Sequence, residues 1–306
     1  MRAEVDEVIS RVATIILGKQ HQLRLALACL LARGHLLIED LPGVGKTTLA
    51  HALATILGLH YQRIQFTSDL LPADILGVSI YNRDSGGFQF HPGPVFSHIV
   101  LADEINRATP KTQSALLEAM EEHQVTVEGE TRQLPQPFFV IATQNPLYQV
   151  GTFPLPESQL DRFLMRIELG YPDAQAERIL LQGEDRRKLL KEVTTVLSAG
   201  RLLDLQARVD TLHVSDALLD YLQAMLGYSR RAPHYQNGLS PRAGLALLHS
   251  ARAWAFLEGR DMVLPEDLQV VLPAVIGHRL QPATEQTEAQ SVAERVRLFL
   301  ESVPVP

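Results

Sequence analysis

A glycine-rich segment, Leu41-Pro42-Gly43-Val44-Gly45-Lys46-Thr47-Thr48, constrains the fold of this chain more than any other stretch. It follows the apolar run His35 to Glu39 and precedes a helical pattern from Lys46 to Leu57, which stops at Gly58. The apolar run predicts a buried strand, and a glycine after the second pattern is typical of a helix end. A strand, a glycine-rich loop and a helix in this order are the context of a phosphate-binding P-loop.

The residue types in this loop suit the binding of phosphate. Small residues at Gly43 and Gly45 let backbone N–H groups approach phosphate oxygens, and the amino end of the next helix adds a positive potential. The Lys46 ammonium can reach the β- and γ-phosphates of a nucleotide, and the Thr47 hydroxyl can bind Mg²⁺. The alternative is a glycine-rich turn with a surface lysine. We predict phosphate binding by the loop residues Pro42, Gly43, Val44, Gly45, Lys46, Thr47 and Thr48.

Asp40 departs from the usual P-loop pattern, which has a glycine at this position, five residues before the second loop glycine. The half of the motif that serves the reacting phosphates, Gly45-Lys46-Thr47, is intact. We therefore expect nucleotide binding to be retained.

A second apolar run, Ile99 to Ala102, ends in two carboxylates, Asp103 and Glu104. In P-loop enzymes one carboxylate at such a strand end holds the water shell of Mg²⁺. A second carboxylate can polarise the attacking water if it lies within hydrogen-bond reach. We assign Asp103, with Thr47, to the metal and Glu104 to the water. The alternative is that these carboxylates cap the start of the next helix.

A third apolar run, Phe138 to Ala142, leads to Asn145. An amide at this strand end could orient the water or contact the γ-phosphate, although Asn-Pro is also an ordinary turn starter. The alternation of apolar runs with helical patterns, up to about residue 170, predicts a parallel sheet with helices on both faces.

Two predicted hairpins interrupt this alternation. One joins Val78–Tyr81 to Phe88–Phe90 through Asp84-Ser85-Gly86-Gly87, and the other joins Gln124–Val127 to Thr131–Leu134. After Pro172 the pattern is wholly helical, with Ser215 and Ser240 as predicted helix caps. We predict an α/β nucleotide-binding domain over 1–172, a linker over 173–189 and an all-α domain over 190–280. A tail over 281–306 should hold one short helix, Ser291 to Ser302.

Charge and composition restrict the possible partners. The formal net charge is -7, and the one dense basic cluster, Arg186-Arg187-Lys188 with Lys191, lies among acidic residues. We interpret it as a solvated helix face, which argues against a nucleic-acid surface. The eleven histidines show no ligand spacing, so we predict no metal beyond nucleotide-bound Mg²⁺.

The single cysteine, Cys29, lies in an apolar run and is predicted to be a buried, unreactive thiol. The first residues, Met1 to Gln22, mix charged with apolar side chains and lack the apolar core of a signal peptide. No apolar stretch reaches the roughly 20 residues that a membrane span requires. We therefore expect a cytoplasmic protein without a membrane span.

Several segments together resemble the AAA+ superfamily of P-loop ATPases and, within it, the MoxR family. The most specific is Leu101-Ala102-Asp103-Glu104-Ile105-Asn106-Arg107-Ala108, continued by Lys111 to Met120. The resemblance covers nearly the whole chain and includes Gly93-Pro94-Val95-Phe96, Ala142-Thr143-Gln144-Asn145-Pro146, Leu155-Pro156-Glu157, Leu160-Asp161-Arg162-Phe163, Ser240-Pro241-Arg242-Ala243 and Gly259-Arg260-Asp261.

The resemblance implies a three-layer αβα AAA+ domain followed by a smaller helical lid, with ATP bound between the two. It also implies a role for further residues. Asn145 and Arg242 would be the two sensors, and Gly18 and Lys19 would belong to the loop that holds adenine. Arg162 would be the arginine finger that serves the neighbouring subunit's nucleotide, with Arg107 as the alternative and a structural ion pair as the bland interpretation of either.

The two hairpins match insertions of the helix-2-insert branch, to which MoxR proteins belong. The resemblance further implies a ring, a hexamer by analogy. The ring would act as a chaperone-like ATPase, an ATP-driven remodelling, assembly or cofactor-insertion factor for a protein client. MoxR proteins commonly work with partners that carry a von Willebrand factor A domain. Two other functions stay open: a DNA-handling motor of the same branch, and a nucleotide-sensing scaffold with negligible turnover.

Overall fold

A five-stranded parallel sheet forms the centre of the protein in the computed structural model, which describes residues 2–84, 86–145, 151–183, 189–190, 192–283 and 291–305. Its strand order is β2-β5-β8-β1-β9. The strands are β1 (Leu36–Glu39), β2 (Tyr61–Gln65), β5 (Ile99–Asp103), β8 (Phe139–Gln144) and β9 (Met165–Ile167). The central strands are continuous apolar runs because both faces of a parallel sheet are covered.

Helices cover the two faces of the sheet and create two cores. Leu36 and Ile38 of β1 face the larger core, which contains α1 (Arg2–Ile15), α2 (Gln20–Leu31) and α3 (Lys46–Ile56). Leu37 faces a smaller core under α5 (Pro110–Glu122). Side chains of successive strand residues point to opposite faces, so each strand serves both cores. The predicted three-layer α/β arrangement is confirmed.

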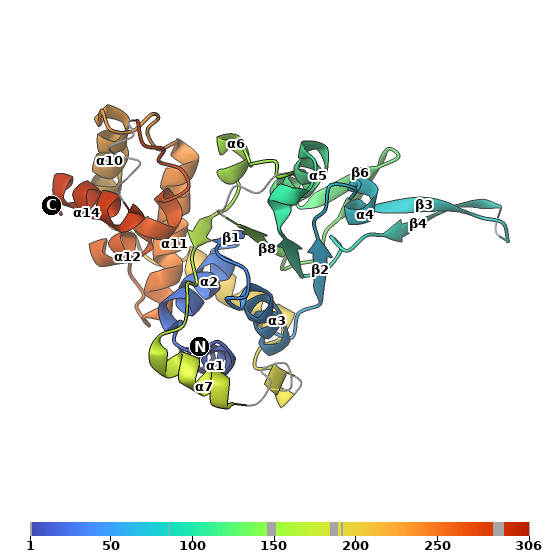
Figure 1. Ribbon diagram of the computed structural model, residues 1–306. Coiled ribbons are helices and arrows are strands. Elements are labelled where there is room, and N and C mark those ends of the chain that lie inside the picture. The colour runs from blue at the N-terminus through green and yellow to red at the C-terminus, as the bar shows by residue number, and fades with distance from the viewer. Residues whose placement is uncertain are drawn as a thin grey trace.

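The helical lid follows β9 in the chain. It contains α9 (Ala199–Asp210), α10 (Asp216–Arg231), α11 (Pro241–Leu257), α12 (Pro265–Ile276) and α14 (Val292–Ser302). The predicted caps are present, since the side chains of Ser215 and Ser240 accept hydrogen bonds from backbone N–H groups of Leu218 and Ala243. In Figure 1 these lid helices, apart from α9, gather at one end of the molecule. The segment predicted as a linker contains α7 (Ala174–Gln182), and the proposed domain boundaries stay predictions.

Both predicted hairpins are present, as β3 (Gly77–Asn82) with β4 (Gly87–Pro92) and β6 (Gln124–Val127) with β7 (Glu130–Gln133). The β3–β4 hairpin extends away from the body at the end opposite the lid (Figure 1). Its apolar side chains are exposed, and Phe88 keeps 75% of its accessible surface. The Arg132 guanidinium of the second hairpin lies 4.1 Å from the ring centroid of Phe90 in the first, so the two hairpins contact each other.

Three short helices complete the described elements: α4 (Pro72–Leu76), the 3-10 turn η1 (Ile105–Arg107) and α6 (Glu157–Leu160). Within the described ranges, none of the helices combines the length and the apolar character needed to cross a bilayer.

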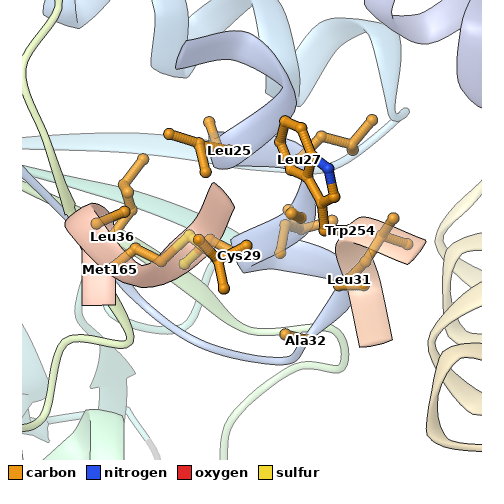
Figure 2. Close-up of a cluster of buried hydrophobic side chains, with 14 of the residues drawn as sticks. Leu25, Leu27, Cys29, Leu31, Ala32, Leu36, Met165 and Trp254 are labelled. Carbon is orange, nitrogen blue, oxygen red and sulfur yellow. The ribbon is translucent and has the colours of Figure 1, made fainter. Parts of the chain in front are cut away.

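Cys29 lies on α2, fully buried in the larger core. Figure 2 shows its sulfur among apolar side chains that include Leu36 of β1 and Met165 of β9. Burial raises the pKa of the thiol, because this environment disfavours the thiolate. The residue is a small apolar contact between the helix and the sheet, as predicted.

The parallel register gives the sheet two chemically different edges. Leu36 of β1 pairs with Ile141 of β8 and with Met165 of β9, and the β2–β5 and β5–β8 pairs are parallel too. All carboxyl ends therefore lie at one edge, where the P-loop, Asp103 and Asn145 follow their strands. All amino ends lie at the other edge, which includes Arg33 to His35 and Asp161 to Leu164.

His35 is a buried hydrogen-bonding residue at the amino edge. The backbone N–H of Val140 donates to Nδ1 at 3.0 Å, so Nε2 carries the proton and donates to the Met120 carbonyl at 3.1 Å. Burial lowers the pKa of His35 to about 4, because the charged imidazolium would lose its hydration. The neutral ring joins β8 to the end of α5.

The pKa of His35 predicts a loss of stability on acidification. Below pH 6.5 the unfolded chain takes up a proton at this ring, whereas the folded protein does so only near its lowered pKa of about 4. The linkage removes about 2 kcal/mol of unfolding free energy between pH 7 and pH 5. We expect His35→Asn, which cannot titrate, to lack this part of the pH dependence. Urea unfolding at both pH values measures it, and equal pH slopes for both proteins would contradict the assignment.

Candidate functional site

The loop between β1 and α3 has the backbone conformation of a phosphate cradle. Gly43 and Gly45 have φ values of +88° and +99°, in the left-handed region that favours glycine. A Cβ atom on Gly43 would meet nothing within 4 Å, so open space faces this backbone. Gly45 is the N-cap of α3, whose amino end is therefore directed at the same space. An anion can approach these N–H groups closely.

A cavity of about 300 Å³ lies at this loop. It brings together residues that follow three different strands, as expected for the carboxyl edge of a parallel sheet. Glycine N–H groups, an ammonium and the oxygen donors of Thr47 and Asp103 suit a nucleotide with Mg²⁺. The residues around the cavity are Pro42, Gly43, Gly45, Lys46, Thr47, Thr48, Asp103, Glu104 and Asn145.

Two expectations from the sequence concern residues that do not border this cavity, and both stay predictions. The side chain of Val44 does not face the cavity and packs against the larger core instead. Among the described residues, none of the lid borders the cavity, and ATP bound between the α/β domain and the lid, as the resemblance implies, stays a prediction. The lid contacts other parts of the same chain, chiefly α2 and β9.

Lys46 is held at the loop by carbonyl oxygens. Its Nζ donates to the Asp40 carbonyl at 2.5 Å and to the Leu41 carbonyl at 3.1 Å. Partial burial lowers the pKa of the ammonium, and the carboxylates of Asp40, Asp103 and Glu104 oppose this shift. A cation with only neutral acceptors can exchange them for phosphate oxygens, which form stronger, charge-assisted hydrogen bonds.

The Thr143 hydroxyl of β8 bridges Asp103 and Glu104 by two hydrogen bonds. The Thr143 hydroxyl donates to Asp103 Oδ1 at 2.6 Å and accepts from the Glu104 backbone N–H at 2.9 Å. Asp103 Oδ2 accepts two hydrogen bonds from Arg63 of β2, at 2.6 and 3.1 Å. The Asp103 carboxylate is thus fixed at the end of its strand.

Glu104 has the left-handed φ of 57°, which is uncommon for a residue with a side chain and is concentrated at functional sites. Its Oε2 accepts from Gln65 Nε2 at 3.0 Å and from Arg107 Nη1 at 2.9 Å. Arg107, the alternative arginine finger, therefore contacts the candidate base of its own chain.

Sequence reasoning missed Arg63, Gln65 and Thr143. The two β2 residues are polar positions on an exposed edge strand and resemble ordinary surface residues in the sequence. Their pairing with β5, which sets Gln65 opposite Asp103, becomes visible only in the register of the sheet.

Gly18 and Lys19, predicted for the adenine loop, lie beside the P-loop cavity rather than around it. A Cβ on Gly45 would come within 3.8 Å of Ile16 Cδ1, which places this loop next to the P-loop. Lys19 Nζ donates to the Tyr171 carbonyl at 2.6 Å. Gly18 approaches Asp173 so closely that a Cβ would lie 3.1 Å from its Oδ2.

Arg162 and Arg242 lie together at the amino edge of the sheet, away from their own P-loop. One carboxylate, that of Glu121 at the end of α5, binds both: Arg162 Nε lies 3.1 Å from Oε2, and Arg242 Nη2 lies 2.5 Å from Oε1. Arg162 Nη1 also donates to the Leu117 carbonyl at 2.6 Å. A cavity of about 230 Å³ opens beside this pair. The structure thus divides the predicted catalytic residues between two edges.

The basic cluster Arg186-Arg187-Lys188, Lys191 and the Pro146 of the Asn-Pro motif lie outside the described residues.

Comparison with known proteins gives two family matches. Residues 35–165 match the family described as ATPase family associated with various cellular activities (AAA). Residues 228–297 match the AAA lid domain. The first match contains the P-loop cavity and Arg162, and the second contains Arg242.

Relatives along the whole chain are also found. The uncharacterised protein YeaC of Bacillus subtilis is 44% identical, covering 99% of this chain and 95% of its own. Chaperone MoxR1 of Mycobacterium tuberculosis is 41% identical over 90% of this chain and 75% of its own. The crystal structure of a proposed ATPase from Cytophaga hutchinsonii superposes with a TM-score of 0.90 at 36% identity, covering 100% of this chain and 96% of that one.

The geometry around Lys46 predicts the outcome of its removal. Lys46→Ala should lower the affinity for ATP by about 100-fold or more, because charge-assisted hydrogen bonds to two phosphates are lost. The melting temperature should change little, since the side chain contacts the loop rather than a core. Titration calorimetry measures the affinity, and Lys111→Ala, at an exposed lysine of α5, is the matched control. Undiminished ATP affinity in Lys46→Ala would remove Lys46 from the site.

Proposed function

Because the chain belongs to the MoxR family of AAA+ ATPases, we propose that it hydrolyses ATP with Mg²⁺ to remodel or assemble a protein client in the cytoplasm. One observation carries the proposal. The P-loop cavity with its two carboxylates lies at one edge of the sheet, and a pair of arginines lies at the other edge.

The residues around the cavity have separate roles in this proposal. The P-loop and Lys46 bind the phosphates, and Thr47 with Asp103 holds Mg²⁺, which neutralises charge on the phosphate oxygens when bound. Glu104 accepts a proton from the attacking water, and Asn145 orients that water. Gln65 and Arg107, both bonded to Glu104 in this structure, hold the carboxylate until it acts.

The arginine pair supports a ring. Arg162 and Arg242 lie at the opposite edge of the sheet from the P-loop of their own chain, and neither borders its cavity. A neighbouring copy that places its arginine edge on this cavity would complete the site, and repetition of such a head-to-tail contact closes a ring. An arginine supplied in this way stabilises charge on the γ-phosphate and can contribute about 10³ to 10⁵ in rate. Six copies are proposed by analogy with the family.

The β3–β4 hairpin supports action on a protein client. Val78, Ile80 and Tyr81 of β3 and Phe88 of β4 present exposed apolar side chains on an element that extends from the body (Figure 1). Exposed apolar surface of this kind marks sites of contact with other proteins. The hairpin is connected to the candidate site through the chain, because β3 follows β2 through α4. Strand β2 carries Arg63, which binds Asp103, and Gln65, which binds Glu104.

The chaperone-like role rests on the relatives, one of which is named a chaperone. A partner with a von Willebrand factor A domain is proposed from the family resemblance. Co-purification of the tagged protein tests both proposals, since a client and a partner with a von Willebrand factor A domain should be recovered with it.

Removal of the candidate base separates binding from hydrolysis. The substitution Glu104→Gln keeps the shape of the side chain and an amide oxygen that can accept the hydrogen bond from Gln65. The amide cannot accept a proton from water. We expect ATP affinity within a few-fold of the wild type and a turnover that is lower by about 10² to 10⁴. Phosphate release measures the turnover and calorimetry measures the ATP affinity, with Glu122→Gln of α5 as the control.

Turnover of Glu104→Gln at the wild-type rate would exclude Glu104 as the base. Negligible turnover of the wild type itself would favour the nucleotide-sensing scaffold.

A mixing experiment tests the arginine edge. Arg162→Ala should bind ATP normally and lose at least about 100-fold in turnover, because its neighbour's nucleotide lacks the guanidinium. Lys46→Ala has the arginine edge but no working site. In mixed rings some interfaces join an intact cavity to an intact Arg162, so activity should partly return.

The control for this experiment is Arg107→Ala mixed with Lys46→Ala. Arg107 bonds to Glu104 in its own chain, so its loss should not be rescued by mixing. Rescue of Arg107→Ala together with no rescue of Arg162→Ala, in oligomers shown to be mixed, would reverse the assignment.

A further inference from the structure

Asp40 occupies the P-loop position where glycine is usual, and its carboxylate binds three backbone N–H groups. Oδ1 accepts from Leu41 at 2.8 Å, and Oδ2 accepts from Leu169 and from Gly170 at 2.6 Å each. The residue is buried, with 8% of its surface exposed. A buried carboxylate with several N–H donors forms strong, charge-assisted hydrogen bonds. A glycine here would leave these donors without an acceptor.

The backbone of Asp40 belongs to the phosphate end of the site. Its carbonyl accepts from Lys46 Nζ, and its N–H donates to the carbonyl of Gln144 at 3.1 Å. Gln144 directly precedes Asn145, the predicted sensor at the end of β8. Asp40 therefore contacts the lysine that serves the phosphates and the strand that positions Asn145.

The carboxylate of Asp40 reaches in the other direction, to the segment that leaves β9. We name this segment, Leu169 to Asp173, the exit segment. Its Tyr171 carbonyl accepts from Lys19 Nζ, and its Asp173 caps α7 by accepting from the Ala176 N–H at 2.7 Å. Gly18 lies against Asp173, where a Cβ would come within 3.1 Å of Oδ2. The exit segment thus contacts both residues that the sequence predicts for the adenine loop.

We propose that Asp40 is a positioning residue that aligns the nucleoside end of the site, the exit segment with Gly18 and Lys19, with the phosphate end at the P-loop. This proposal rests on the proposed function, since it concerns the same ATP site. Asp40 lies between the two ends and contacts both: the backbone serves the phosphates, and the side chain fixes the exit segment. The departure from glycine then has a physical reason, because the Asp40 carboxylate supplies an acceptor that glycine lacks and joins the loop to two N–H groups more than a hundred residues away.

The substitution Asp40→Gly separates this role from a role in folding alone. It restores the usual P-loop residue and removes the acceptor of the Leu169 and Gly170 N–H groups. We expect its affinity for inorganic tripolyphosphate to stay within about three-fold of the wild type, because the loop itself is intact. Its affinity for ATP should fall by about ten-fold or more, since each lost hydrogen bond to a charged group weakens the arrangement of the nucleoside end. Titration calorimetry with the two ligands gives the ratio.

Hydrogen exchange reports on the nucleotide-free chain. Peptides that contain the Leu169 and Gly170 amides should be protected in the wild type and should exchange faster in Asp40→Gly. Glu39→Gln is the matched control, because this neighbouring carboxylate binds Arg166 and Gln144 and does not contact the exit segment. It should change neither the ligand ratio nor the exchange of these amides.

The outcomes are distinguishable. If Asp40→Gly loses equal affinity for ATP and for tripolyphosphate, Asp40 is a structural anchor only and the proposal is wrong. The proposal is also wrong if Asp40→Gly keeps the wild-type affinity for both ligands, whether or not the Leu169 and Gly170 amides exchange faster. If Asp40→Gly does not fold, Asp40→Asn gives the same comparison with a smaller loss for ATP, because its amide retains one acceptor oxygen. Failure of the proposed function itself would appear earlier, as a wild type that binds no ATP.

Discussion

The parallel pairing of the central strands is the constraint on which the rest of the structure depends. Parallel strands collect their carboxyl ends at one edge, and the phosphate loop, Asp103 and Asn145 follow three such ends. The same pairing sends the amino ends to the other edge, where the segment before β9 carries Arg162. One sheet therefore carries the carboxylates of Asp103 and Glu104 at one edge and the guanidinium groups near Glu121 at the other.

The sequence predicts the parts of the site that depend on local order along the chain. A strand, a glycine-rich loop and a helix identify the P-loop, and carboxylates directly after an apolar run identify Asp103 and Glu104. The parts that depend on contacts between distant segments are not visible in this way. Thr143 joins Asp103 to Glu104 only because β5 pairs with β8, and Glu121 binds Arg162 only because α5 packs against one face of the sheet. The placement of the lid against the sheet is a long-range property of the same kind, and the position of ATP relative to the lid stays a prediction.

Most charged groups of the site are held by a partner on another segment. Gln65 binds Glu104, Arg63 binds Asp103, and Glu121 binds two arginines at once. A guanidinium is planar and presents fixed donors, so a carboxylate that binds one side of it sets the direction of the remaining donors. These contacts reduce the number of conformations of each side chain before a nucleotide or a neighbour arrives. Such preorganisation lowers the entropy that must be lost during binding.

Hydrogen bonds join the helical lid to the segment that carries Arg162. Arg279, just beyond α12, has 6% of its side chain exposed and donates to the Asp161 carboxylate at 2.6 Å and to the Phe163 carbonyl at 2.7 Å. These acceptors flank Arg162 on both sides in the chain. Arg242, at the start of α11, binds the same Glu121 as Arg162. Arg242 belongs to the lid, and Arg279 of the lid binds the residues on both sides of Arg162, so a movement of the lid against the sheet would displace Arg242 and the segment that carries Arg162.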